Sequence, residues 1–216
     1  KSSSAIINQL MTFAEFQVAA WNKFVYPFYE EAQGRVVSSA VSQVAQERIQ
    51  HPILCQAIKA KNFIADIALE SFLPGINDEK LQEALGAGAL GFLEADMFRG
   101  YKQEGIDAVG LMPLYAYQRL SAGELRRINW SKEESIKPLV ISDDNKEQLR
   151  IEIKFNRRNY IVSFYIIEAN GIPVILAYQP DILTELYPYD PERIKQCAFM
   201  GKVFVELFKA LGKAPD

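Results

Sequence analysis

The sequence predicts an α/β protein built on a Rossmann-like parallel sheet, with a helical amino-terminal segment and an antiparallel meander. Three patterns indicate this class: two short apolar runs separated by a glycine-rich loop and a helical repeat, a later pair of alternating runs joined by turn residues, and an amphipathic stretch near the carboxyl end. The chain has 216 residues, of which 49% are hydrophobic, so a sizeable core is possible.

The first sixty residues have a helical pattern. Apolar residues recur at helical spacing from Ala5 to about Ala60, and the pattern breaks at Pro27, at Gly34 and at His51 with the proline that follows it. We expect two or three helices here. The predicted organisation is therefore a helical segment over residues 1–60 and a Rossmann-like domain over residues 61–216, with an antiparallel insertion at about 136–180.

A strand, a helix and a second strand follow. Residues 62–69 (NFIADIAL) form a short apolar run typical of a buried strand, although so short a run is also compatible with a helix. The glycine-rich loop at 85–91 then opens a stretch with apolar residues on one helical face, and the apolar run 106–115 comes next. Together these segments predict a right-handed βαβ unit with parallel strands.

The remaining pattern predicts an antiparallel meander and a final helix. The charged stretch 121–137 is expected on the surface as a loop or short helix. Apolar and polar residues alternate over 149–155, a second apolar run covers 160–167, and Asn170-Gly171 leads into the run 172–178, which is a strong hairpin signal. A last helix is expected over about 191–211, with a proline near its start and a glycine after its end.

Charge, cysteine content and hydropathy narrow the function classes. With 24 basic and 27 acidic residues mixed along the chain, no basic stripe marks a nucleic-acid surface. The two cysteines, Cys55 and Cys197, have no metal-ligand spacing, which favours a reducing cytoplasm. No run of about 18 apolar residues predicts a membrane span. The chain begins with Lys1 and stops at Asp216, so we expect a processed or truncated product.

Several motifs resemble the amino-terminal half of the α-glucan (glycogen and maltodextrin) phosphorylases. Residues 85–95 read LGAGALGFLEA, similar to the family's L-G-N-G-G-L-G-x-L-A loop, and Asp96 matches an Asp of the shorter bacterial and archaeal forms. The strand around Val109-Gly110-Leu111 is similar to V-G-L-L-Y, residues 172–176 to V-P-L-Y-L, and residues 190–216 to the helix that precedes H-L-N-E-G-H. The resemblance covers about residues 62–216 in a consistent order.

The resemblance implies a glycosyltransferase of two facing Rossmann-like domains, of which this chain holds the first. The intact enzyme would release glucose 1-phosphate from α-1,4-glucan with pyridoxal phosphate, but the cofactor's lysine lies in the absent half, so no cofactor is expected in this chain. The implied substrate- and phosphate-binding residues are those of the loop, Gly86, Ala87, Gly88, Ala89 and Leu90. Amides at a helix amino terminus suit an anion. Ala87 replaces an Asn and Ala89 a Gly, so we expect only weak, millimolar phosphate binding.

Alternatives accompany this interpretation. The isolated chain is expected to be inactive, with no catalytic residue and no metal site. Its expected partners are an α-glucan or sugar phosphate, the missing carboxy-terminal domain and a second copy in a homodimer. Neither a nucleic acid nor a membrane is expected as a partner. A second hypothesis is a non-catalytic half-domain acting in sugar binding, regulation or assembly. A third is an unrelated nucleotide- or sugar-binding Rossmann-like protein. The glycine loop is also compatible with a purely structural role in strand-to-helix packing.

Four other features favour structural readings. Glu94 and Asp96 do not face each other on a helix. Arg157-Arg158 is expected in a solvated turn. His51, the only histidine, is weakly placed for catalysis. The aromatic residues near Trp21 are more typical of a helix interface than of sugar stacking.

Overall fold

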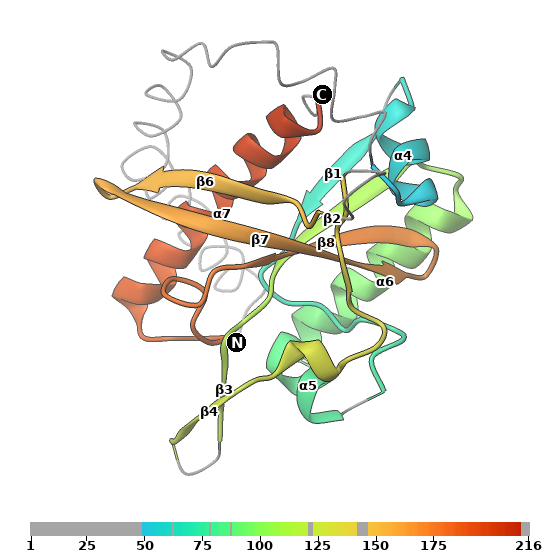
Figure 1. Cartoon of the computed structure of the whole chain (residues 1–216). Coiled ribbons are helices and arrows are strands. Elements are labelled where there is room, and N and C mark those ends of the chain that lie inside the picture. The colour runs from blue at the N-terminus through green and yellow to red at the C-terminus, as the bar shows by residue number, and fades with distance from the viewer. Residues whose placement is uncertain are drawn as a thin grey trace, which may run out of the picture. The chain divides into compact units, whose positions relative to one another are not determined.

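A mixed six-stranded sheet runs through the described part of the chain (Figure 1). The computed structural model describes residues 49–61, 63–77, 79–86, 88–120, 123–141 and 147–212, all within one unit, Ala40–Asp216. The strand order is β1-β2-β8-β7-β5, and β6 also pairs with β7. The strands are β1 (Ile64–Ile67), β2 (Ala108–Pro113), β5 (Lys137–Pro138), β6 (Arg150–Phe155), β7 (Arg158–Ala169) and β8 (Ile172–Tyr178).

The parallel half of the sheet agrees with the sequence prediction. Strands β1 and β2 are parallel, in a register that places Ile64 opposite Ala108, and helix α6 (Ala89–Gln103) connects them after the glycine loop. Strand β8 continues the parallel arrangement beside β2. The predicted strand, glycine loop, helix and strand are therefore confirmed.

The antiparallel half is the predicted meander. Strands β6, β7 and β8 pair in sequence order and antiparallel. Asn170 and Gly171, which join β7 to β8, have φ of 52° and 79°, and Asn156 and Arg157, which join β6 to β7, have φ of 47° and 63°. Two consecutive residues with positive φ are typical of the tight turns that suit hairpin twist.

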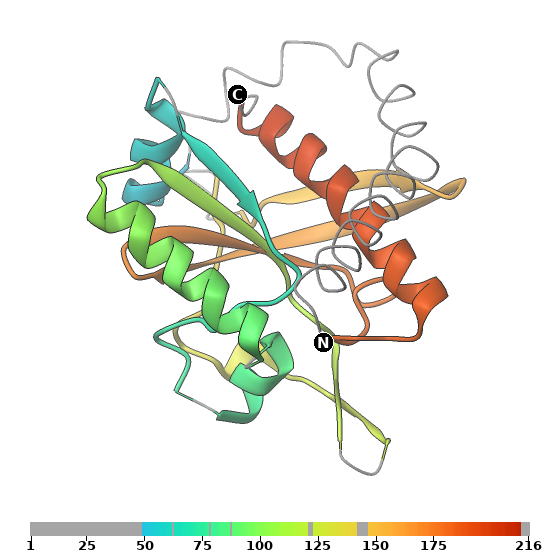
Figure 2. The same ribbon diagram turned by 180° about the vertical axis from the view of Figure 1, so that it is seen from behind.

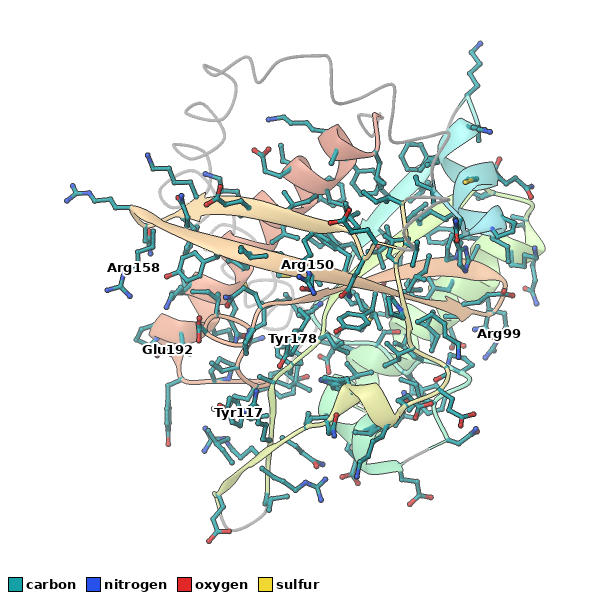
Figure 3. All side chains as sticks on the ribbon, in the orientation of Figure 1. Arg99, Tyr117, Arg150, Arg158, Tyr178 and Glu192 are labelled. Carbon is teal, nitrogen blue, oxygen red and sulfur yellow. The ribbon has the colours of Figure 1, made fainter. Side chains whose placement is uncertain are left out.

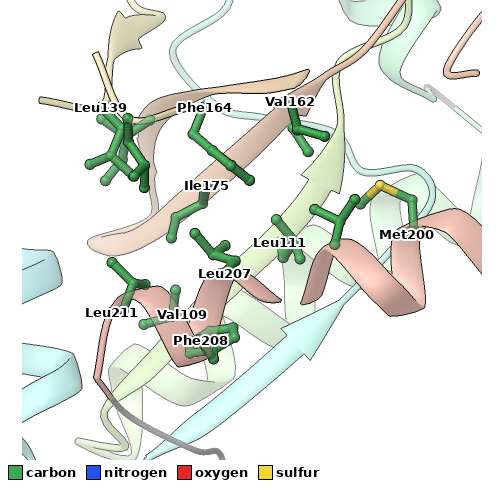
Figure 4. Close-up of a cluster of buried hydrophobic side chains, with 14 of the residues drawn as sticks. Val109, Leu111, Leu139, Val162, Phe164, Ile175, Met200, Leu207, Phe208 and Leu211 are labelled. Atoms are coloured by element: carbon green, nitrogen blue, oxygen red, sulfur yellow. The ribbon is translucent and has the colours of Figure 1, made fainter. Parts of the chain in front are cut away.

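Two hydrophobic clusters cover the two faces of the sheet. Because side chains alternate along a strand, Val109 and Leu111 of β2 belong to one cluster while Ala108 and Met112 belong to the other. The first cluster joins the sheet to helices α4 (Pro52–Lys59) and α7 (Asp190–Ala210), and Figure 4 shows part of it. The second joins the sheet to α6 and to helix α5 (Glu79–Leu85). Figure 2 shows β1 and β2 passing between α6 and α7.

The structure adds elements that the sequence analysis did not predict. Helix α5 lies between the apolar run 62–69 and the glycine loop, where no helix was expected, because seven residues are too few to display a helical period. Strands β3 (Tyr117–Arg119) and β4 (Leu125–Arg127) form a separate antiparallel hairpin, and the 3₁₀ turn η2 (Trp130–Lys132) follows it. The stretch 121–137, expected on the surface as a loop or short helix, therefore contains strand β4, whose three residues are exposed, and the short helical turn η2.

The prediction for the amino-terminal segment is only partly covered by the described residues. Helix α4 lies within residues 1–60 and is helical as expected, whereas the helices expected before residue 49 lie outside the described residues. The division at residues 60 and 61 stays a prediction. Within the described residues, none of the helices has the length and apolar character needed to cross a membrane.

Candidate functional site

A cavity of about 490 Å³ lies where the segments that follow the parallel strands meet. In α/β folds, ligands bind beyond the carboxyl ends of parallel strands, and ligand cavities commonly measure about 300–1,000 Å³. The lining comes from the segment after β1, from α5 and the glycine loop, from β3, and from the segment after β8. Its residues are Glu70, Glu83, Ala84, Gly86, Gly88, Tyr117, Gln118, Arg119, Leu120, Leu186 and Tyr187. We call this cavity the Glu70 pocket.

The glycine loop forms one wall of the Glu70 pocket. Gly86 is buried with φ of 111°, and a side-chain Cβ there would lie within 2.8 Å of Glu70 Oε2, so both the backbone conformation and the available space require glycine. Gly88 precedes α6, and Ala89 and Leu90 are exposed at its first turn. Ala87 lies outside the described residues. Of the five residues implied by the resemblance, Gly86 and Gly88 therefore line the cavity.

Glu70 provides a buried carboxylate that points toward this loop. The residue is only 6% exposed, and its Oε1 accepts a hydrogen bond from the hydroxyl of Tyr187. Its Oε2 is buried without a hydrogen-bond partner and lies 3.7 Å from the position that a Cβ of Gly88 would take. A buried acceptor without a donor costs about 1–3 kcal/mol, so a ligand that donates a hydrogen bond to this oxygen would be favoured.

Tyr187 holds Glu70 from the opposite side. Its backbone φ of 57° is rare for a bulky residue and is stabilised only where the surroundings demand it. Partial burial and the hydrogen bond to Glu70 raise the pKa of Tyr187 to about 12, so its hydroxyl remains a donor at neutral pH. The guanidinium of Arg193 lies 5.4 Å from the centre of the Tyr187 ring.

Arg119 lies at the edge of the pocket in an ion pair with Glu185. Arg119 Nη2 is 2.5 Å from Glu185 Oε1, and this hydrogen bond raises the pKa of Arg119. Glu185 is 5% exposed, and its Oε2 has no hydrogen-bond partner. The Arg119 guanidinium also lies 5.8 Å from the centre of the Tyr189 ring. These contacts hold the β3 side of the pocket against the segment after β8.

Gln196 fixes the segment that follows β8. This residue of α7 is 2% exposed, and its Nε2 donates to the carbonyl oxygens of Ile182 at 3.2 Å and Glu185 at 3.3 Å. The backbone amide of Tyr117 donates to the Thr184 carbonyl at 2.7 Å. The helix and the sheet therefore position the residues around Glu185 and Tyr187 jointly.

The donor and acceptor set of the Glu70 pocket suits recognition of hydroxyl groups. Glu70 supplies an acceptor, while Arg119, Tyr187 and Gln118 carry donor groups, although each already has a protein partner. The described lining contains no lysine, histidine or cysteine. It therefore supplies no amine for an imine with pyridoxal phosphate, and these residues do not fit that cofactor.

Three other features discussed from the sequence lie outside the Glu70 pocket. His51 caps α4, its Nδ1 accepting from the Leu54 amide at 3.3 Å, and burial lowers its pKa. Asp96 pairs with Arg99 on the exposed surface of α6 at 3.0 Å. Arg157 lies in the β6–β7 turn and Arg158 begins β7.

Glu70 and Tyr187 were missed by the sequence analysis. Glu70 follows the apolar run 62–69 directly, and a polar residue at the end of a parallel strand is a signal that could have identified it. No comparable signal exists for Tyr187, because its approach depends on how the segment after β8 returns to β1.

Comparison with solved structures shows a fold similar to part of a glycosyltransferase. The described fold resembles the catalytic domain of starch synthase IV from Arabidopsis thaliana, bound to ADP and acarbose, with a TM-score of 0.50 and 17% sequence identity. The match covers 73% of this chain and 27% of the starch synthase chain. No family model and no curated protein matches the sequence. The described residues thus form an α/β domain whose fold is similar to part of that starch synthase domain, and the chain spans about a quarter of that neighbour's length.

Proposed function

We propose that this chain is the amino-terminal part of an α-glucan phosphorylase-like glycosyltransferase, and that its Glu70 pocket binds a saccharide. In the intact enzyme the reaction would be phosphorolysis of α-1,4-glucan to glucose 1-phosphate, whereas this chain alone is inactive. The ordered resemblance over residues 62–216 and the similarity to part of a starch synthase support this proposal.

The observation that carries the saccharide assignment is the unpartnered Glu70 Oε2. A sugar hydroxyl can donate to this oxygen without bringing a charge into the pocket. Hydrogen bonds to charged groups contribute about 1.5–3 kcal/mol each. The amides at the start of α6 can donate to other sugar oxygens.

The same carboxylate opposes phosphate. Two like charges about 4 Å apart near a protein surface repel by about 4 kcal/mol. A dissociation constant of about 1 mM corresponds to about 4 kcal/mol of binding free energy. The charge of Glu70 therefore disfavours phosphate at this helix terminus, and a neutral saccharide is the better ligand.

Calorimetric titration of the chain with maltotriose and with inorganic phosphate tests the proposal. The Glu70→Gln variant keeps the size of the side chain but removes its charge, and we expect maltotriose affinity to fall by about tenfold or more. Phosphate affinity should rise in the same variant. Glu152→Gln is the matched control, because Glu152 is exposed on β6 and outside the pocket lining.

Two results would contradict the proposal. One is equal maltotriose affinity in the parent and in Glu70→Gln. The other is phosphate binding that is tighter in the parent than in the variant. That result would support the phosphate-binding role of the loop implied by the family resemblance.

The second candidate is a non-catalytic half-domain that binds sugar. The position of Glu70 beside the loop favours it, because a phosphorolytic site must admit phosphate near its sugar. Combining this chain with a carboxy-terminal half of a maltodextrin phosphorylase and assaying glucose 1-phosphate separates the two candidates. Activity of the mixture supports the catalytic role, and saccharide binding without activity supports the second.

A further inference from the structure

A second cavity of about 440 Å³ lies at the base of the β3–β4 hairpin. Its lining is Leu114, Arg127, Ile128, Asn129, Trp130, Tyr165 and Tyr178. None of these residues lines the Glu70 pocket, although Arg127 of this cavity pairs in register with Tyr117 of the other. Figure 3 labels Tyr117 and Tyr178, one from each lining. We call this second cavity the Trp130 pocket.

Trp130 is a fixed part of the wall. It is 5% exposed, and its indole Nε1 donates to the Tyr115 carbonyl oxygen at 2.6 Å. The Tyr115 hydroxyl in turn donates to the Leu69 carbonyl at 2.8 Å. Because its own polar atom is already bonded inside the protein, the indole offers the cavity only apolar ring surface.

Two tyrosines from neighbouring strands supply polar hydroxyl groups to the cavity. The rings of Tyr165 on β7 and Tyr178 on β8 are 6.4 Å apart and inclined at 84°, and both residues are partly exposed. Among the described residues, neither hydroxyl has a hydrogen-bond partner. With the exposed Arg127 and Asn129, the cavity therefore combines aromatic surface with polar groups around it.

We propose that the Trp130 pocket is a second saccharide-binding site, which takes a pyranose ring of an oligosaccharide. A pyranose presents C–H groups on its faces and hydroxyls around its edge, matching aromatic walls with polar groups between them. A flat nucleobase would gain most from two parallel rings, which the nearly perpendicular tyrosines do not provide. The site differs from the Glu70 pocket in having no carboxylate in its lining.

Tryptophan fluorescence reports on this cavity directly. The chain has two tryptophans, so the Trp21→Phe variant leaves Trp130 as the sole tryptophan, whose emission is selected by excitation at the red edge of the indole absorption. Titration of that variant with maltotriose should change its emission and saturate. Adding Tyr178→Leu should weaken the response by about tenfold, whereas Tyr178→Phe keeps the ring and should weaken it less. Circular dichroism melting checks that each variant is folded.

A Glu70→Gln change in the same background separates this proposal from the proposed function. The Trp130 response should persist in that variant, even if the Glu70 pocket binds no sugar at all. Loss of the response in Glu70→Gln would assign the signal to the first pocket and overturn the second site. An emission change that adenosine produces at lower concentration than maltotriose would overturn the saccharide assignment, as would a Tyr178→Leu variant with unchanged affinity.

Discussion

At the scale of single residues, two glycines of α6 differ in what surrounds them. A Cβ on Gly91 would fall on the carbonyl oxygen of Gly86, whereas a Cβ on Gly100 would meet nothing within 4 Å. The amide of Phe72 also donates to the Gly91 carbonyl at 2.9 Å, which fixes the helix against the segment after β1. The glycine loop thus has a packing role whether or not it binds a ligand.

Replacing these two glycines with alanine should have opposite effects on stability. We expect Gly91→Ala to lower the free energy of unfolding by about 2 kcal/mol or more, because backbone atoms must move. Gly100→Ala should raise it by up to about 1 kcal/mol, because alanine favours helix at an open position. Urea denaturation measures both. Equal effects of the two changes would contradict the close approach of α6 to the loop.

Glu94 makes part of the stability depend on pH. Burial, and next the charge of Asp66, raise the pKa of Glu94 from 4.5 to about 7, and its Oε1 has no hydrogen-bond partner. Asp66 meanwhile accepts from the Tyr101 hydroxyl at 2.9 Å. A raised carboxyl pKa means that the folded state favours the protonated form. The contribution of Glu94 is therefore fully present below pH 4.5 and is lost as the pH rises through about 7.

The Glu94→Gln variant should remove this dependence. The free energy of unfolding of the variant minus that of the parent should be larger at pH 8 than at pH 5. The reason is that glutamine cannot ionise beside Asp66. Chemical denaturation at the two pH values measures the difference. Asp96→Asn is the control, since Asp96 lies in an exposed ion pair that contributes little to the free energy of unfolding. A constant difference between Glu94→Gln and the parent from pH 5 to pH 8 would refute this account.

At the scale of secondary-structure elements, the β7–β8 turn connects the sheet to α6. Asn170 has φ of 52°, and its Nδ2 donates to the Ala95 carbonyl at 3.2 Å. The sequence predicted the turn from Asn-Gly alone, but the bond to α6 is a tertiary contact. One side chain therefore closes the hairpin and anchors the helix.

Two substitutions of Asn170 separate these roles. Asn170→Ala should lower the free energy of unfolding by about 2 kcal/mol, through a strained positive φ and a lost hydrogen bond. Asn170→Gly relieves the strain and should cost about 1 kcal/mol. Asn156→Gly, at the positive-φ position of the β6–β7 turn, is the control and should be neutral or stabilising. Thermal melting compares the three variants. An equal loss of stability in both Asn170 variants would show that backbone strain at this position does not contribute.

At the scale of the whole molecule, the proposed function makes a prediction about turnover. The isolated chain should release no glucose 1-phosphate from maltodextrin in the presence of phosphate, because the cofactor lysine and the facing domain belong to the other half of the family's enzymes. A coupled assay, with an intact maltodextrin phosphorylase as positive control, checks this. Product formation above buffer would disprove the proposal that this chain is inactive alone.

Local patterns were enough to predict most of the sheet. The apolar runs before and after the glycine loop became parallel strands, and Asn170-Gly171 marked its hairpin, because side-chain alternation and positive φ are properties of a few adjacent residues. The ordered motifs also predicted an α/β fold with a parallel sheet, which is similar to part of the starch synthase domain. Short elements such as α5 and β3 carried too few residues for a period.

The two pockets were decided by tertiary structure. Glu70 meets Tyr187 across 117 positions of sequence, and Trp130 is joined to Tyr165 and Tyr178 by the return of the chain through β7 and β8. The sequence by itself determined the longer strands and helices and the glycine-rich loop between the two parallel strands. Whether the carboxylate of Glu70 or the backbone amides decide which ligand suits that loop depends on the distant side chains that the fold brings beside it. The reason is that the strength of charge–charge interactions and hydrogen bonds changes over a few ångströms.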